Sequence, residues 1–306
     1  MMHKSKIISW IKIMRLEFYS MPLVVYSLGA LIFYRFNDLF LPINYVFGYL
    51  IIFLIELLTV FTNEYYDFEA DMLNKTPGRF TGGSRMLVEN KISIKGLKTS
   101  LIFVSLFLLI LSGYLLNITF FSHQVLFLLA IGIIFGISYT TPPLKLSYKG
   151  LGELDVAFIH GFYVIICGYV FQKGILDTNI IWIITMPIFF SSLAGVSLAG
   201  IPDIDSDRLV TKKTLASIIG PKNILIFSTI CSLITGIFGI YLYSLFNLWQ
   251  LSYLYLLLPI YSICISYIFL SKMKSKKHEM GINKMIFMSM ILIALSSFTS
   301  VIIFIL

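Results

Sequence analysis

The chain has 306 residues, of which 58% are hydrophobic and 12% are charged, and its mean hydropathy is +0.92. Soluble domains are about half apolar and about a quarter charged, so this chain has too little polar surface to cover a water-exposed globule. Because a membrane-spanning helix takes about 20 residues, little of the chain remains for a separate soluble domain.

Nine apolar windows are long enough to cross a membrane as helices. They lie at residues 16–34, 43–66, 95–117, 120–140, 153–172, 179–200, 223–245, 249–271 and 283–306. Membrane-spanning β-strands alternate polar and apolar side chains, and runs such as 101–111 show no such alternation. The sequence therefore predicts an all-α integral membrane protein, with nine transmembrane helices in one bundle and a single domain over residues 1–306.

The Lys and Arg residues are distributed unevenly between the two sides of this bundle. Twenty-one of the 23 fall on the side of the N-terminal segment, and only Arg35 and Lys173 fall on the other. Because cytoplasmic loops are enriched in Lys and Arg, we expect a cell (inner) membrane protein with its N-terminus inside and its C-terminus outside. This topology accounts for much of the net charge of +8, so no nucleic-acid partner is expected.

Two of the predicted helices end in acidic motifs. At the end of the second window, Asn63, Asp67 and Asp71 are spaced four residues apart, so they share one helix face. At the end of the sixth window, Asp203 and Asp207 have the same spacing. Carboxylates at this spacing repel one another unless a cation lies between them. Oxygen ligands suit Mg²⁺, which shares its coordination with substrate phosphates, so the four aspartates predict a site for a magnesium-bound diphosphate.

The two aspartate pairs are separated by a constant offset of 136 residues. This offset suggests an internal duplication of about residues 16–140 and 153–271, with the helix at about 283–306 appended.

A basic segment follows each acidic motif. Arg79 and Arg85 flank a Gly-rich stretch after the first motif, and Lys212 and Lys213 come after the second. Exposed backbone amides and cationic side chains are suited to phosphate oxygens. These segments are therefore candidates for binding the diphosphate.

Together the two motifs and the segment from Tyr139 to Glu153 resemble the UbiA superfamily of intramembrane prenyltransferases. The resemblance implies a cytoplasm-facing cavity in which the aspartates hold Mg²⁺ and the diphosphate of an isoprenoid donor. Asn63 would orient that donor and join the four aspartates as the catalytic residues. Many family members have Asp after this Asn, whereas this chain has Glu64; the acid is retained, so we expect little consequence.

The same resemblance implies a set of substrate-binding residues. Those that contact phosphate or neutralise its charge are Arg79, Arg85, Tyr139, Lys145, Lys212 and Lys213. Arg15 is the remaining substrate-binding residue, and it belongs to a first helix that resembles the family's acceptor-side helix.

The resemblance implies transfer of a polyprenyl group to an aromatic acceptor, as in menaquinone or other quinone biosynthesis. The stretch 150–155 is similar to the branch that prenylates 1,4-dihydroxy-2-naphthoate, and benzoate, haem, chlorin and glycerol-type acceptors stay open. A membrane terpene cyclase would share the donor site without an acceptor. A cation-coupled transporter is a further alternative, although acids clustered at one membrane face are less typical of transporters than acids at the midplane.

Overall fold

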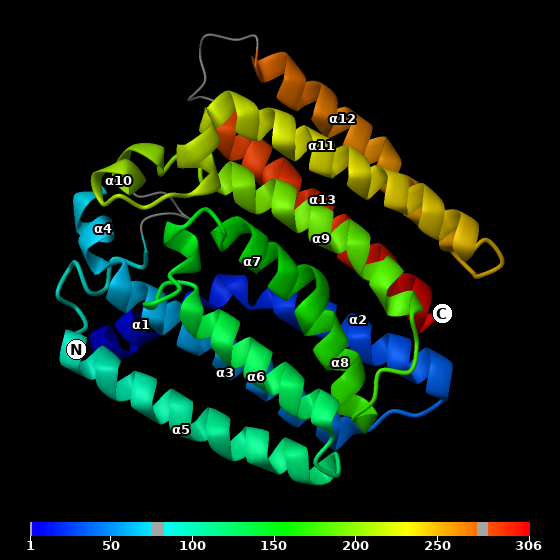
Figure 1. The fold of residues 1–306 in the computed structure, drawn as a ribbon, viewed down its shortest axis with the longest axis horizontal. Helices are drawn as coiled ribbons and strands as arrows, with labels where there is room; N and C mark the ends of the chain where they lie inside the picture. Colours follow the sequence, from blue (N-terminus) through cyan, green and yellow to red (C-terminus); the bar gives the residue numbers. More distant parts are fainter. Residues whose placement is uncertain (1, 75–82, 274–280) are drawn as a thin grey trace.

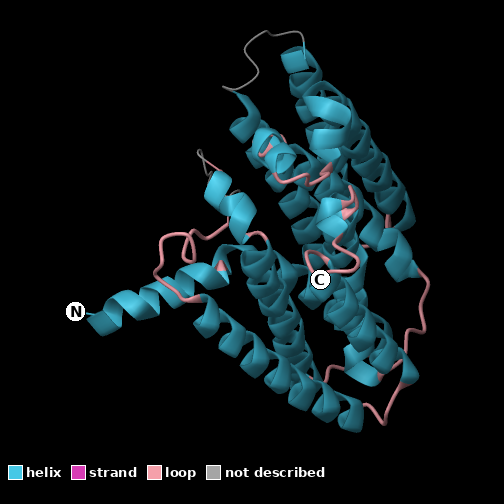
Figure 2. Ribbon diagram, turned by 60° about the vertical axis from the view of Figure 1, so that its left-hand side comes forward, coloured by secondary structure: helices cyan, strands magenta, loops and turns pink. Residues whose placement is uncertain are grey.

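The computed structural model describes residues 2–74, 83–273 and 281–306. These residues form helices joined by loops, and no strand occurs among them (Figure 2), which confirms the all-α class. In chain order the elements are α1 (Met2–Met14), η1 (Leu16–Phe18), α2 (Ser20–Asn37), α3 (Pro42–Tyr66), α4 (Phe68–Leu73), α5 (Ile94–Ile118), α6 (His123–Ser138), η2 (Leu146–Tyr148), α7 (Gly152–Phe158), η3 (Ile159–Tyr163), α8 (Val164–Lys173), α9 (Ile180–Ala199), α10 (Ile204–Leu209), α11 (Leu215–Leu245), η4 (Ser252–Leu256), α12 (Leu257–Met273) and α13 (Ile282–Ile305).

Within the described residues, seven helical segments are long and apolar enough to cross a membrane, so the chain is an integral membrane protein. They comprise α3, α5, the continuous segment from α7 to α8, α9, α11, η4 with α12, and α13. An eighth span would be the pair Lys6–Phe18 and Ser20–Asn37, which is bent by 49°. Helix α6 is apolar but has only 16 residues. A total of nine spans therefore requires both the bent pair and α6 to cross the membrane, and it stays a prediction.

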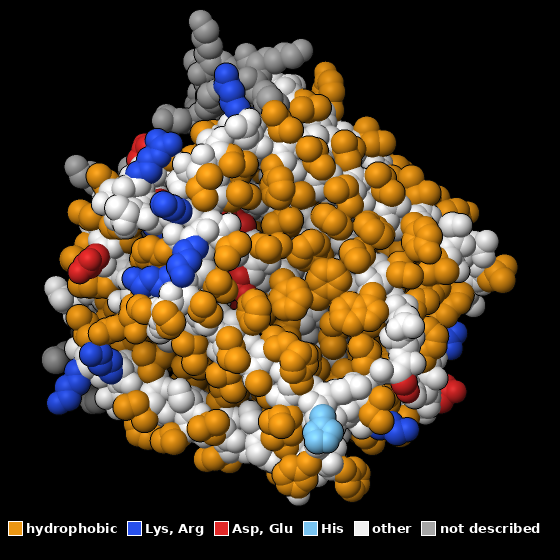
Figure 3. Space-filling model, in the orientation of Figure 1, with side chains coloured by type: hydrophobic (Ala, Val, Ile, Leu, Met, Phe, Trp, Pro, Cys, Tyr) orange, Lys and Arg blue, Asp and Glu red, His pale blue; other side chains and the backbone are white. Residues whose placement is uncertain are grey.

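The outer surface of the bundle is apolar. On α5, for example, Ile102, Phe103 and Ile110 are 62%, 67% and 66% exposed. Hydrophobic side chains cover most of the face in Figure 3, and the Lys and Arg side chains on that face gather mainly toward the end that carries α1, α4 and α10 in Figure 1. Apolar side chains on this surface suit contact with lipid. The helices also satisfy their own backbone hydrogen bonds, which lipid cannot do.

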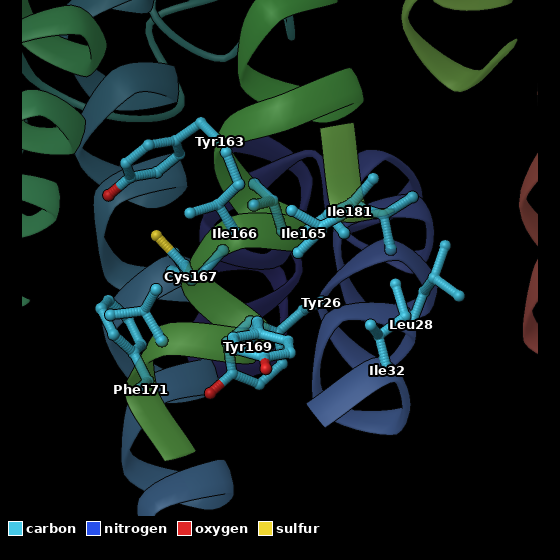
Figure 4. Close-up of a cluster of buried hydrophobic side chains, with 14 of the residues drawn as sticks. Tyr26, Leu28, Ile32, Tyr163, Ile165, Ile166, Cys167, Tyr169, Phe171 and Ile181 are labelled. Atoms are coloured by element: carbon cyan, nitrogen blue, oxygen red, sulfur yellow. The ribbon is translucent and has the colours of Figure 1, made fainter. Parts of the chain in front are cut away.

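Helices α2 and α8 pack against each other in the core, and Figure 4 shows several of their buried side chains. Glycines bring the two backbones together: a Cβ atom at Gly29 would lie 1.9 Å from the Ile165 carbonyl oxygen. A Cβ atom at Gly168 would lie 2.0 Å from the Tyr26 carbonyl oxygen. Small residues are the usual means by which membrane helices pack closely.

The two acidic motifs lie at the same end of the bundle, because the short helices α4 and α10 contact each other there (Figure 1). Each of these helices has six residues, and their bounds differ by the same 136 positions as the motifs. The N-terminus lies toward this end and the C-terminus toward the opposite end. The wider four-helix duplication stays a prediction.

Replacing Gly168 by Ala is expected to destabilise the protein, because the new methyl group would overlap the α2 backbone. Overpacking of this kind costs about 1–3 kcal/mol, so the melting temperature in detergent should fall by several degrees. Gly113→Ala on α5 is the matched control, since a Cβ atom there would meet nothing within 4 Å. Equal melting temperatures for the two variants would contradict the proposed close contact.

Candidate active site

Each acidic motif lies at a break between a long helix and a short one. Asp67 separates α3 from α4 with φ −90° and ψ 4°, and Asp203 precedes α10 with φ −94° and ψ 0°. The amides of Asp71 and Asp207 each donate to the carbonyl oxygen four residues earlier, at 2.8 Å. The spacing that placed both acids of a pair on one face is therefore kept across both breaks.

The two motifs open into one cavity of about 710 Å³. All five residues that we predicted as catalytic line it: Asn63, Asp67, Asp71, Asp203 and Asp207. A direct link joins the motifs, since the Asn74 amide donates to Asp203 Oδ1 at 3.4 Å. The structure thus brings together residues from distant parts of the chain, although their catalytic roles stay predictions.

Both carboxylate oxygens of Asp67 make polar contacts at this end of the cavity. Its Oδ2 lies 3.0 Å from Lys212 Nζ, and its Oδ1 accepts a hydrogen bond from the Tyr148 hydroxyl at 2.7 Å. Burial by itself would lower the pKa of Lys212, but Asp67 first, and then Tyr139 and Asp207, raise it above the ordinary value. Lys212 is therefore a permanent positive charge within the acidic cluster.

Lys212 does not neutralise the whole cluster. Burial, reinforced by the negative charges of Asp67 and Glu64, raises the pKa of Asp71 to about 7. Burial also raises the pKa of Asp207, whose Oδ2 accepts a hydrogen bond from the Thr214 hydroxyl at 3.1 Å. Burial is the main cause of both raised pKa values, and the positive charge of Lys212 offsets it only in part.

These features fit a hard divalent cation. All the candidate ligands are oxygens, and the buried side-chain oxygen Oδ1 of Asn63 has no hydrogen-bond partner. Within the described ranges, no group of three or more His, Cys, Asp or Glu side chains is arranged to hold an ion by itself. A bound ion would therefore need ligands from a substrate or water, which is how Mg²⁺ is commonly held at phosphate sites.

Glu64 anchors Ser84, which follows the first motif. Its two carboxylate oxygens accept hydrogen bonds from the Ser84 amide at 2.6 Å and the Ser84 hydroxyl at 2.7 Å. The next residue, Arg85, donates from its guanidinium to the Asp71 carbonyl oxygen. Gly83 has φ +64°, and a Cβ atom there would lie 2.0 Å from Asp71 Oδ2. Glu64 thus has a specific structural role that the sequence analysis did not expect.

The remaining predicted substrate-binding residues differ in their positions. Arg15 and Tyr139 line the cavity, whereas Arg85, Lys145 and Lys213 are not among its lining residues. Lys145 Nζ lies 4.8 Å from the centre of the Tyr148 ring. The Lys213 side chain is exposed, and its amide donates to the Tyr148 carbonyl oxygen at 3.3 Å.

Arg79 lies outside the described residues.

Several polar residues of the site escaped the sequence analysis. Tyr148 and Glu153 belong to the segment that carried the family resemblance, but the spacing of residues does not show that they reach the site. Glu153 accepts a hydrogen bond from the Leu215 amide at 2.9 Å and so joins the starts of α7 and α11. Asn74 follows Asp71 by three residues, and Thr214 comes directly after the predicted Lys212 and Lys213, but neither was predicted to contact the aspartates.

The rest of the cavity is largely apolar. Its lining changes from the charged end near α4 and α10 to aliphatic and aromatic side chains, which include Ile52, Val156, Ile159, Met290 and Phe298. A cavity with one charged end and an apolar interior matches an amphiphile that has an anionic headgroup and a hydrocarbon tail.

The model of the UbiA prenyltransferase family matches residues 23–291. Over 142 residues, or 45% of this chain, the sequence is 31% identical to the chloroplastic 2-carboxy-1,4-naphthoquinone phytyltransferase of Arabidopsis thaliana. The chain spans between 34% and 38% of the length of the curated relatives that it matches.

Solved structures share the fold along nearly the whole chain. A digeranylgeranylglyceryl phosphate synthase aligns with a TM-score of 0.70 at 19% identity, over 98% of this chain and 99% of that one. A UbiA homologue from Archaeoglobus fulgidus, bound to GPP and Mg²⁺, aligns with a TM-score of 0.66 at 18% identity, over 97% and 100%. The chain belongs to the UbiA prenyltransferase family.

Proposed function

We propose that the protein transfers a polyprenyl group from an isoprenoid diphosphate to an aromatic acceptor in a Mg²⁺-dependent reaction of quinone biosynthesis. One observation carries this proposal: two aspartate pairs and Lys212 line one end of a cavity whose remaining lining is largely aliphatic and aromatic. The diphosphate would occupy the charged end, and the hydrocarbon tail would occupy the apolar part.

The residues that would hold Mg²⁺ are Asp67, Asp71, Asp203 and Asp207. The presence of all four carboxylate groups in the lining of one cavity supports this assignment, because oxygen ligands suit Mg²⁺. When bound, Mg²⁺ would stabilise the negative charge that develops on the departing diphosphate.

The chain's own residues position the donor and keep water away from it. Lys212 and Arg15 supply positive charge to the cavity, and the Asn63 side chain would hydrogen-bond the donor. As the allylic C–O bond breaks, the electron pair leaves with the diphosphate and a carbocation remains. The aliphatic lining excludes water that would trap this cation, so an aromatic carbon can attack it and then lose a proton.

Phosphate contacts by Arg79, Arg85, Tyr139, Lys145 and Lys213 are also part of the proposal. The Arg85 guanidinium would act indirectly, by holding the Asp71 backbone through the hydrogen bond that it donates to the carbonyl oxygen. Lys145 and Lys213 lie outside the lining of the cavity and would reach a phosphate only by moving their side chains.

The quinone acceptor is supported by the similarity to a naphthoquinone phytyltransferase. A purified-enzyme assay with Mg²⁺, a labelled polyprenyl diphosphate and a panel of aromatic acids, with products identified by mass, tests the proposal directly. A prenylated acceptor is the expected product. A hydrocarbon or terpene alcohol formed without acceptor would favour the terpene cyclase instead.

We infer that the charged end of the cavity faces the cytoplasm, in the cell (inner) membrane. The distribution of Lys and Arg supports this orientation, with the N-terminus inside and the C-terminus outside. In this topology, the bent α1–α2 pair and α6 complete nine spans, and residues 16–140 and 153–271 form the two repeats within a single prenyltransferase domain.

Asp67→Asn and Asp203→Asn are each expected to reduce prenyl transfer by at least about a hundredfold, because each removes a charge that acts on the leaving group. The exposed acids Glu69 and Asp205 provide matched controls within the same motifs. Glu69→Gln and Asp205→Asn should retain activity. Transfer near the wild-type rate in both Asp67→Asn and Asp203→Asn would remove the metal assignment.

Chelation of divalent ions is expected to stop turnover, since among the described lining residues only Lys212 and Arg15 would then offset the diphosphate charge. Product formation measured in EDTA should fall to background and return when excess Mg²⁺ is added. Turnover that persists in EDTA would exclude the proposed Mg²⁺ dependence.

Arg85→Ala is expected to raise the donor KM more than it lowers kcat, because its guanidinium anchors the backbone of Asp71. Hydrogen bonds from charged groups contribute about 1.5–3 kcal/mol, so the donor KM should rise roughly tenfold or more. Lys91→Ala is the control, since Lys91 is exposed and pairs only with Glu89 among the ion pairs of the described residues. A donor KM that is equal in the two variants would limit Arg85 to a role in topology.

A further inference from the structure

Tyr148, the last residue of η2, is not among the described residues that line the cavity. Its side chain nevertheless contacts two residues that do line it. The Tyr148 hydroxyl donates to Asp67 Oδ1 at 2.7 Å, and Lys212 Nζ lies 5.3 Å from the centre of the Tyr148 ring. Asp67 belongs to the first acidic motif and Lys212 follows the second. One side chain behind the cavity wall therefore joins the two motifs.

The backbone around Tyr148 is held on both sides. The Ser147 amide donates to the Tyr139 carbonyl oxygen at 2.9 Å, and the Lys213 amide donates to the Tyr148 carbonyl oxygen at 3.3 Å. These hydrogen bonds tie η2 to the end of α6 and to the segment that follows the second motif. They fix the point from which the Tyr148 side chain reaches Asp67, as a residue that positions a site requires.

The Tyr148 hydroxyl restrains the Asp67 carboxylate. A hydroxyl group that donates to a carboxylate forms a charge-assisted hydrogen bond, which is stronger than one between neutral groups. Lys212 contacts the other oxygen, Oδ2, at 3.0 Å, so both oxygens are held. Because a carboxylate group has about four acceptor positions, these two contacts leave capacity for a cation. Asp67 is thus oriented and can still bind an ion.

The ring of Tyr148 holds positive charge beside the site. Lys145 Nζ lies 4.8 Å from the ring centre and Lys212 Nζ lies 5.3 Å from it. Both distances are within the roughly 6 Å over which an aromatic ring attracts a cation. The ring therefore gives Lys212 a contact that does not depend on Asp67.

The segment that carries Lys212 is also tied to the second motif. The Lys212 amide donates to the Asp207 carbonyl oxygen at 2.9 Å, and the Thr214 hydroxyl donates to Asp207 Oδ2 at 3.1 Å. The contacts of Tyr148 with Lys212 and with the Lys213 amide thus connect η2 to this motif through its backbone as well as through charge.

We propose that Tyr148 is a positioning residue for prenyl transfer, whose hydroxyl orients Asp67 toward Mg²⁺ and whose ring holds Lys212 for the diphosphate. This inference rests on the proposed function. Groups that hydrogen-bond a metal ligand from behind typically contribute about 10–100-fold to metal affinity. Because the hydroxyl and the ring act on different neighbours, their contributions can be removed one at a time.

Tyr148→Phe removes the hydroxyl and keeps the ring. Binding of Mn²⁺ to the purified protein, measured by EPR with farnesyl thiolodiphosphate present, should weaken by about tenfold or more. In this donor analogue, sulfur replaces the oxygen of the bond that breaks. The Kd of the analogue at saturating Mn²⁺ should stay within about threefold of wild type, because the hydroxyl does not contact the cavity. A general loss of structure would weaken both affinities.

Tyr148→Leu removes the ring as well. The Kd of the analogue at saturating Mn²⁺ should then rise about fivefold above its value in Tyr148→Phe, the scale of one cation–π contact. Tyr66→Phe is the matched control, since Tyr66 directly precedes Asp67, is exposed, and packs its ring against Tyr65. Both affinities should be unchanged in this control, and melting in detergent checks that each variant is folded.

The outcomes separate this inference from the proposed function. Wild-type Mn²⁺ affinity in Tyr148→Phe would overturn the orientation of Asp67 by the hydroxyl, and so would equal losses of Mn²⁺ and analogue affinity. An analogue Kd that is the same in Tyr148→Leu and Tyr148→Phe would overturn the hold of the ring on Lys212. A wild-type protein that binds neither Mn²⁺ nor the analogue would instead overturn the proposed function itself.

Discussion

The ion pair between Lys212 and Asp67 is the contact on which the rest of the site depends. Two acidic motifs from distant parts of the chain share one cavity, and like charges in a buried space repel one another. Lys212 lies within this cluster, 3.0 Å from Asp67, and the Tyr148 hydroxyl satisfies the other oxygen of the same carboxylate. Four aspartates line this end of the cavity, and burial together with the negative charges of Asp67 and Glu64 raises the pKa of Asp71, so a bound cation would stabilise the ionised cluster.

The membrane accounts for the separation of polar and apolar chemistry. The helices present apolar side chains to lipid, so charged groups are stable only at the ends of the bundle or within it. The breaks at Asp67 and Asp203 turn two short helices over the charged end, where α4 contacts α10. Glu64 then anchors the following segment through Ser84, and this contact places Arg85 against the Asp71 backbone.

Much of the fold was readable from composition and hydropathy, because a helix that spans lipid must carry a long apolar run. The windows matched helices such as α3, α5, α9 and α13 closely. The first window missed the 49° bend between Phe18 and Ser20, since a change of helix direction has no signature in hydropathy. The seventh window began too late, because α11 starts at Leu215 and continues through a kink at Gly220.

The sequence by itself determined the membrane class, the two acidic motifs and the family resemblance, since these depend on local periodicity and on residue type. Only the tertiary structure decided which polar groups meet. Tyr148 reaches Asp67 across 81 positions, and Lys212 reaches it across 145. Neighbouring Lys213 instead exposes its side chain, although spacing treats the two lysines alike. Contacts at such separations depend on how helices pack, and packing is a property of the whole bundle rather than of any one segment.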